Sequence, residues 1–292
     1  MKKILSNTLI ILILSLLLNY SIVQAECRKD TILIFQFESG STLRKNYQRI
    51  IYQYNSQNKI LEELNQDWNI NINDWVNFGR LSYFYDVTNN NSTETFQFWN
   101  TSINKWEYNI KNEYKYDGQK NLIERSTQNW NNANKSWDNN NKILNNYSVT
   151  NQLLESIIQF WNNDQSTWMD YHKDSYMYDV NNNLIQHTSN EWDLVQGLWV
   201  NINKFSLLYD INNNLFEKLH QKWDLDIDDW LNYVDEIYLY DSENNQINYL
   251  RKEWNINKNI WENKTKYISN YNFNKQIKEQ LIQSWNLTNN EW

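Results

Sequence analysis

Four aspartates lie between two tryptophans in the segment WDLDIDDW, residues 223–230. Alternating carboxylates are ligands in calcium-binding loops, and paired carboxylates are the acid and base of glycosidases. The segment lacks the Gly that gives a calcium loop its sharp turn, and it lacks the Glu at loop position 12. It therefore predicts weak calcium binding at most, and a solvated loop is the simpler interpretation of Asp224, Asp226, Asp228 and Asp229.

Few other residues have the spacing that chemistry needs. The histidines His172, His187 and His220 have neither metal-ligand spacing nor a neighbouring Cys. Cys27 is the single cysteine, so no disulfide within the chain is expected. The sequence holds no Gly-rich phosphate loop, and no acidic pair stands out as a catalytic pair. We therefore predict a protein that is not an enzyme, with no catalytic residues, metal ligands or cofactor.

The tryptophans follow a strict period of 31 residues, and all 16 belong to it. Within each period two Trp lie seven residues apart, without insertion or deletion: Trp68 and Trp75, Trp99 and Trp106, Trp130 and Trp137, Trp161 and Trp168, Trp192 and Trp199, Trp223 and Trp230, Trp254 and Trp261, Trp285 and Trp292. We count the first Trp as repeat position 1. Position 2 is then always Asn or Asp, position 18 is always Tyr, and position 30 is mostly Gln. Such self-similarity indicates a repeat architecture.

Each repeat has the pattern of β-hairpins. Aromatic and aliphatic residues recur at period two, and Asn fills the turns because it tolerates a left-handed backbone nearly as well as Gly. We predict an all-β fold, a repeat array of antiparallel β-hairpins in an extended or coiled meander sheet, with roughly 15–17 strands. Residues 1–25 are predicted as a signal peptide, 26–67 as an N-terminal strand and degenerate capping repeat, and 68–292 as seven full repeats plus a partial eighth.

The two turns of each repeat are expected to preserve strand alternation. Trp of positions 1 and 8, Tyr of positions 16 and 18, and Gln of position 30 would then share one face. Gln of position 30 is expected opposite Asn of position 10, as an amide ladder. The other face would carry Lys of position 13, as at Lys111, Lys142, Lys173 and Lys204. We expect the aromatic face to turn inward and to be the main stabiliser.

The alternative is that the tryptophans stay exposed. Aromatic stripes of that kind stack on sugar rings or on partner proteins, and a large exposed apolar patch marks an interaction site. The candidate stacking residues are Trp161, Trp168, Trp192, Trp199, Trp223 and Trp230.

The first 25 residues indicate the localisation of the protein. Two lysines precede an apolar run from Leu9 to Leu18, and Val23-Gln24-Ala25 is a small-residue cleavage pattern. We therefore predict a cleaved signal peptide and a secreted or cell-surface protein. The formal net charge of −8 argues against nucleic acid as a partner, because phosphate neutralisation needs a basic face.

The units YDVNNNLIQHTSNEW (178–192) and YDINNNLFEKLHQKW (209–223) carry a family resemblance. They resemble the Trp-rich YD-type repeats of proteins secreted by Bacteroidetes, and are distantly similar to the YD repeats of Rhs-type proteins. The resemblance covers residues 37–292 and departs where Asn183 and Asn214 replace the usual Gly. It implies a β-strand scaffold with no defined activity.

Three functions remain open at this point. The first is a structural or adhesin-like interaction scaffold, whose partner is a polysaccharide or a cell-surface protein. The second is a carbohydrate-binding module that uses the aromatic stripes. The third is a fragment of a larger Rhs-like shell protein, because Trp292 ends the sequence eight residues into a repeat. The sheet edges also predict self-association.

Overall fold

The computed structural model describes residues 30–37, 44–86 and 90–292, so the predicted signal peptide lies outside the described part. This part contains 17 β-strands and no helix, in agreement with the predicted all-β meander. No helix long and apolar enough to cross a membrane occurs in it. The strands are β1 (Thr31–Phe37), β2 (Arg44–Tyr54), β3 (Ile60–Asn69), β4 (Asp74–Tyr85), β5 (Asn91–Asn100), β6 (Lys105–Tyr116), β7 (Leu122–Asn131), β8 (Ser136–Tyr147), β9 (Leu153–Asn162), β10 (Thr167–Tyr178), β11 (Leu184–Asp193), β12 (Leu198–Tyr209), β13 (Leu215–Asp224), β14 (Asp229–Tyr240), β15 (Gln246–Asn255), β16 (Ile260–Tyr271) and β17 (Ile277–Ser284).

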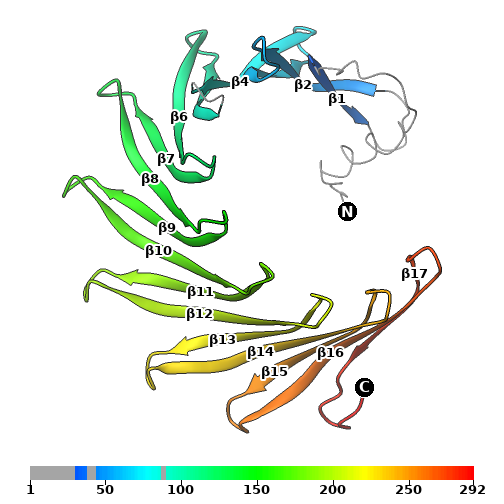
Figure 1. Cartoon of the computed structure of the whole chain (residues 1–292). Coiled ribbons are helices and arrows are strands. Elements are labelled where there is room, and N and C mark those ends of the chain that lie inside the picture. Colours follow the sequence, from blue (N-terminus) through cyan, green and yellow to red (C-terminus); the bar gives the residue numbers. More distant parts are fainter. Residues whose placement is uncertain (1–29, 38–43, 87–89) are drawn as a thin grey trace. The chain divides into compact units, whose positions relative to one another are not determined.

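The chain divides into two compact units, residues 1–78 and 79–292. In the first unit, β2 pairs with both β1 and β3 in antiparallel fashion. In the second unit, the rest of β4 pairs with β5, and each later strand pairs with the strand that follows it in sequence. Figure 1 shows the successive hairpins of the second unit from β7–β8 to β15–β16.

The hairpin between the two Trp of a repeat closes with a four-residue turn, as between Asn100 and Lys105. The side chain at position 2 caps this turn: Asn100 Oδ1 accepts the N–H of Ser102, and Asp193 Oδ1 accepts that of Val195. Position 6 has a left-handed backbone, with φ of 54° at Asn104. The predicted tolerance of Asn for this conformation is confirmed, although Lys, Ser, Asp and Gly occupy the position in other repeats.

The second turn of each repeat follows Tyr of position 18. In the repeat of Asp179, its Oδ1 accepts the N–H of Asn181 and Asn183, and Oδ2 accepts the amide of Asn183. The same amide of Asn183 also bonds Asn213 in the next repeat, at 3.1 Å. Tyr209 joins the repeats once more, since its hydroxyl donates to the backbone oxygen of Leu184 at 3.0 Å. These bonds stack each turn on its neighbour.

A β-bulge at position 11 changes which residues lie on each face of the sheet. In β11–β12, Asn190 pairs with Asn201 while Ser189 pairs with Asn203, so Ile202 is passed over. The residues passed over in the six hairpins that show this shift are Asn109, Asn140, Tyr171, Ile202, Tyr233 and Lys264. One extra residue inverts the alternation of all that follow it. The Tyr of positions 16 and 18 therefore lie on the face opposite the Trp, and Lys of position 13 lies on the Trp face. The prediction that Trp and Tyr share a face is wrong.

The described residues form no closed apolar core. Among the described residues Val234 is the only buried apolar side chain, and no large side chain is fully buried. The tryptophan side chains are half-buried, so each is more exposed than a core residue and less exposed than a fully solvated one. The prediction that they face inward as a core is therefore wrong. Each strand contacts its neighbours in sequence, so stability is expected to be local and roughly additive along the array.

Candidate functional site

Each repeat carries a pair of indoles in edge-to-face contact. All eight Trp pairs make this contact across two strands or a bridge, with ring centroids 5.0–5.1 Å apart and interplanar angles of 66–77°. This geometry suits the aromatic quadrupole, whose positive edge meets a negative face. In the second unit the pairs form a row along one margin of the sheet.

A cation from the preceding repeat, two strands away, lies over the second indole of most pairs. Lys173 Nζ is 4.8 Å from the centroid of Trp199, and Lys204 Nζ is 4.8 Å from that of Trp230. The full set of these contacts spans 4.7–5.6 Å and pairs Arg49 with Trp75, Arg80 with Trp106, Lys111 with Trp137, Lys142 with Trp168, Lys173 with Trp199, Lys204 with Trp230, and Lys266 with Trp292. The bulge brings these cations to the Trp face, so their predicted place on the opposite face is wrong.

An amide ladder runs beside the indoles, as predicted. Gln128 Nε2 donates to Asn139 Oδ1 at 3.0 Å, and Gln221 Nε2 donates to Asn232 Oδ1 at 3.1 Å. Position 30 also meets position 13 on the preceding strand, where Arg80 donates to Gln97 Oε1 at 2.6 Å. The Trp face thus combines indole rings, cations and amides in most repeats.

The tips of two adjacent Trp hairpins separate and leave a groove of about 640 Å³. The ladder between β12 and β13 starts only at Asn203 and Lys222. Toward the tips, Trp199 pairs with Trp192 and Trp223 pairs with Trp230, each within its own hairpin. A second cavity of about 340 Å³ shares part of this lining and extends it toward Lys222.

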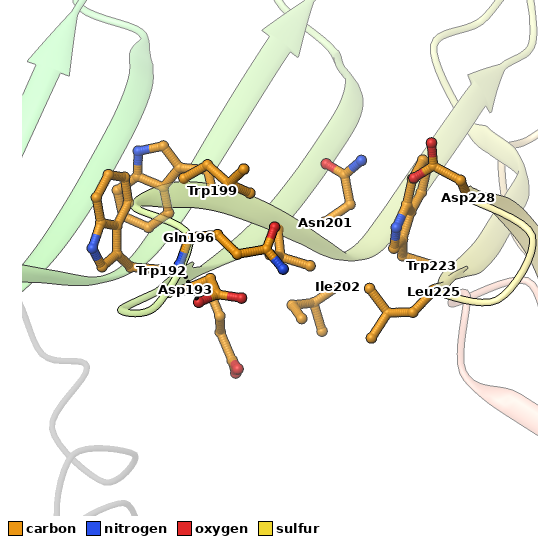
Figure 2. Close-up of a pocket in the computed structure, with 12 residues that line it drawn as sticks. Trp192, Asp193, Gln196, Trp199, Asn201, Ile202, Trp223, Leu225 and Asp228 are labelled. Carbon is orange, nitrogen blue, oxygen red and sulfur yellow. Dashed lines mark hydrogen bonds between the residues drawn. The ribbon is translucent and has the colours of Figure 1, made fainter.

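Figure 2 shows how the lining is arranged. Trp192 and Trp199 lie together at one end, Trp223 lies at the other with Asp228 beside it, and Gln196 lies between them. The remaining lining is aliphatic and polar: Glu191, Asp193, Leu198, Val200, Asn201, Ile202 and Leu225. Three indoles and three carboxylates thus face one groove whose lining has no Lys or Arg. Such a surface suits a ligand with apolar faces and hydrogen-bonding or cationic groups.

The structure brings together three of the six predicted stacking residues, Trp192, Trp199 and Trp223. Trp230 contacts the groove only through its pair with Trp223. Trp161 and Trp168 pair with each other and do not line this groove.

The aspartates of WDLDIDDW have separate places. Asp224 Oδ1 accepts the N–H of Asp226 at 2.8 Å, which is the capping role of position 2 in every repeat. Asp228 occupies the left-handed position 6, with φ of 56°, and lines the groove. Asp229 accepts the N–H of Trp230. Among the described residues no group of three or more His, Cys, Asp or Glu is arranged to hold a metal ion.

The opposite face carries a feature that the sequence pattern did not reveal. The three histidines belong to one cluster there, although they come from different repeat positions. His187 stacks on Tyr176 and Phe205, with centroids 4.9 and 5.5 Å away, and His220 stacks on Phe205 at 4.3 Å. His172 lies beside this row, since Asp174 contacts both its Nε2 at 3.3 Å and His187 Nε2 at 2.7 Å. Only pairing registers could have placed these residues together.

Two titrating groups of this row are perturbed in different ways. Burial raises the pKa of Asp174, but hydrogen bonds and charge from His187 and His172 outweigh burial and leave its pKa below the usual range. The pKa of His220 is lowered by burial and then by the charges of Lys222 and Lys218. His220 therefore stays neutral near pH 7, while Asp174 stays ionised.

No protein-family model and no curated protein sequence matches the chain. Several solved structures are similar. A protein of unknown function from Bacteroides fragilis has a TM-score of 0.39 and 17% identity over 47% of this chain and 95% of its own. A DUF3836 family protein from Bacteroides vulgatus has a TM-score of 0.26 and 22% identity over 31% and 89%. The Photorhabdus luminescens Tc holotoxin pore has a TM-score of 0.38 and 13% identity over 87% of this chain and 14% of the toxin chain.

Two of these three structures come from Bacteroides species. Likenesses at such low identity and TM-score carry no inference about activity.

Proposed function

We propose that this protein is a secreted or cell-surface, non-enzymatic β-repeat scaffold that binds a partner through its Trp margin. The observation that carries the proposal is the groove lined by Trp192, Trp199 and Trp223. Apolar side chains at the adjoining tips add to this surface, with Val195 95% and Leu225 76% exposed. Apolar surface of this extent on a hairpin margin is typical of an interaction site.

The scaffold proposal is tested by retention on cell surfaces. The purified chain is incubated with bacterial and host cells, beside the variants Trp223→Ala and Trp130→Ala. Trp130 occupies the same repeat position outside the groove, so it is a matched control. We expect the wild type and Trp130→Ala to be retained and Trp223→Ala to be lost. Failure of the wild type to bind any surface would refute the adhesive role.

The proposed secretion is tested at the N-terminus of the protein. If residues 1–25 are a signal peptide, the exported chain begins near Glu26. Intact mass measurement of the protein from culture medium and from cell fractions gives the answer. A full-length chain found only in the cytoplasm would contradict the proposed secretion.

Carbohydrate binding is the second candidate, and the mixed lining of the groove favours it. Indole rings stack on the apolar faces of sugars, while Gln196, Asn201 and the carboxylates can bond hydroxyl groups. A glycan array followed by calorimetry tests this candidate, with Trp223→Ala as the variant that loses binding. Retention on cells that protease treatment abolishes, without any glycan hit, would favour a protein partner instead. A place within a larger Rhs-like shell stays a prediction, which the gene sequence beyond Trp292 tests.

A further inference from the structure

The row of cations over the indoles is broken at one repeat. Position 13 is Lys or Arg in every other repeat, but it is Asp235 in the repeat that precedes the Trp254 and Trp261 hairpin. Within the described structure no Lys or Arg lies over Trp261, in contrast to the second indole of the other pairs. The Trp254 and Trp261 rings keep the usual contact, with centroids 5.1 Å apart at 71°. The break therefore concerns the cation and leaves the Trp pair intact.

Asp235 is buried and only half satisfied. Its side chain is 9% exposed, and Oδ2 lies 3.3 Å from Lys252 Nζ. Its Oδ1 is buried and accepts no hydrogen bond from any described group. A buried carboxylate oxygen without a donor costs free energy, so this oxygen favours a cationic or hydrogen-bonding visitor.

The local charge differs from that of the other repeats. Elsewhere position 13 is a cation that faces an uncharged amide at position 30, such as Lys204 opposite Gln221. Here Asp235 faces Lys252, so this pair carries one positive charge less. The other nearby charges, Arg251, Glu253, Glu262 and Lys264, are at positions on the opposite face, where Lys264 lies 3.7 Å from both glutamates.

We propose that Asp235 and Trp261 form a binding site for an alkylammonium group supplied from outside the chain, such as a lysine side chain of a partner protein. The ammonium would donate to Asp235 Oδ1 and lie over the Trp261 ring, where the other repeats place their own lysine. The Trp261 ring is only half-buried and can be reached from solvent, whereas Asp235 Oδ1 is enclosed, so the ammonium reaches this oxygen by displacing the side chains that cover it.

The chemistry selects an ammonium over other cations. Calcium and magnesium need several oxygen ligands, whereas Asp235 is a single carboxylate with one oxygen already bound to Lys252. A guanidinium binds best to two free carboxylate oxygens at once, and only Oδ1 is free here. One ammonium N–H directed at one oxygen matches what the site offers.

The test uses n-butylammonium, which reproduces the end of a lysine side chain, and the full chain labelled with ¹⁵N. The indole N–H signal of Trp261 is assigned by loss of that signal in Trp261→Phe. We expect this signal to shift saturably with n-butylammonium and not with potassium chloride at equal ionic strength. Asp235→Asn keeps the shape but removes the charge, so we expect its affinity to fall at least about tenfold.

The double variant Asp235→Lys with Lys252→Gln restores the residues of the other repeats. It is expected to fold and to lose the n-butylammonium response, because its own lysine then covers Trp261. The indole signals of Trp199 and Trp230 report folding in every variant. No saturable shift in the wild type would refute the proposal, since water would then satisfy Oδ1. An undiminished response in the double variant would refute it as well.

Discussion

Replacement of Trp230 by Ala tests whether the half-buried indoles hold the array together. An indole buries about 150–250 Å² when fully enclosed, so a half-buried one removes roughly 100 Å² from water. At about 25 cal/mol per Å² this contributes about 2.5 kcal/mol. The edge-to-face contact with Trp223 adds about 0.5–1.5 kcal/mol, and the Lys204 contact adds about 0.5–1 kcal/mol. We therefore expect the local free energy of unfolding to fall by about 3.5–5 kcal/mol, the sum of these contributions.

The assay is amide hydrogen exchange, because a long repeat array need not unfold in one step. Exchange should quicken in β12, β13 and β14, while β5 to β8 keep their protection, since each strand contacts its sequence neighbours. Leu225→Ala is the control, because Leu225 is 76% exposed and contributes little burial. A uniform loss of protection along the second unit would refute the local picture. A loss below about 1 kcal/mol would refute the role of the indole.

Three further predictions concern the cation row, the bulge and the turns. Lys204→Met keeps the aliphatic arm and removes the charge over Trp230, so we expect the free energy of unfolding in denaturant to fall by about 0.5–1 kcal/mol. The same decrease in a Trp230→Ala background would contradict a direct contact between Lys204 and Trp230. Deletion of Ile202 removes the bulge, and amide exchange in β11 and β12 should rise; unchanged exchange would show that the bulge sets no register. Hydrogen bonds from the Asn of position 23 lower the pKa of the turn aspartates, so their stabilisation is lost as pH falls below about 5. The melting temperature should therefore fall in acid, and less steeply once Asn replaces all four of Asp117, Asp179, Asp210 and Asp241.

The sequence was sufficient for the features that every repeat shares. The Trp pairs and the amide ladder depend on positions 1, 8, 10 and 30, whose residue types recur. Asn55 accepts hydrogen bonds from its turn through Oδ1 as the aspartates do in other repeats, although it lies in the degenerate capping repeat, which ends at residue 67 before the first Trp.

The bulge could not be predicted, because its position carries no shared residue type. Asn109, Tyr171 and Ile202 all occupy position 11, and only the pairing registers show that each is passed over. Since one extra residue inverts the alternation, this one omission misplaced both the lysines and the tyrosines. The groove and the histidine row were missed for another reason. They depend on residues that occur in single copies, such as Asp228 and His220, and that meet across repeats.

The Asp235 and Lys252 pair also bears on how such a chain finds its own partners. Strands of similar sequence can pair in the wrong order, within one chain or between two chains, and repeat proteins misassemble in this way. With a strand from another repeat, Asp235 would face Gln or Asn, and Lys252 would face Lys or Arg. Either exchange leaves a charge unpaired or opposed. One ion pair, at a place where the other repeats pair a cation with an amide, thus distinguishes a single strand junction in an otherwise repetitive sheet and favours the correct alignment of its neighbours.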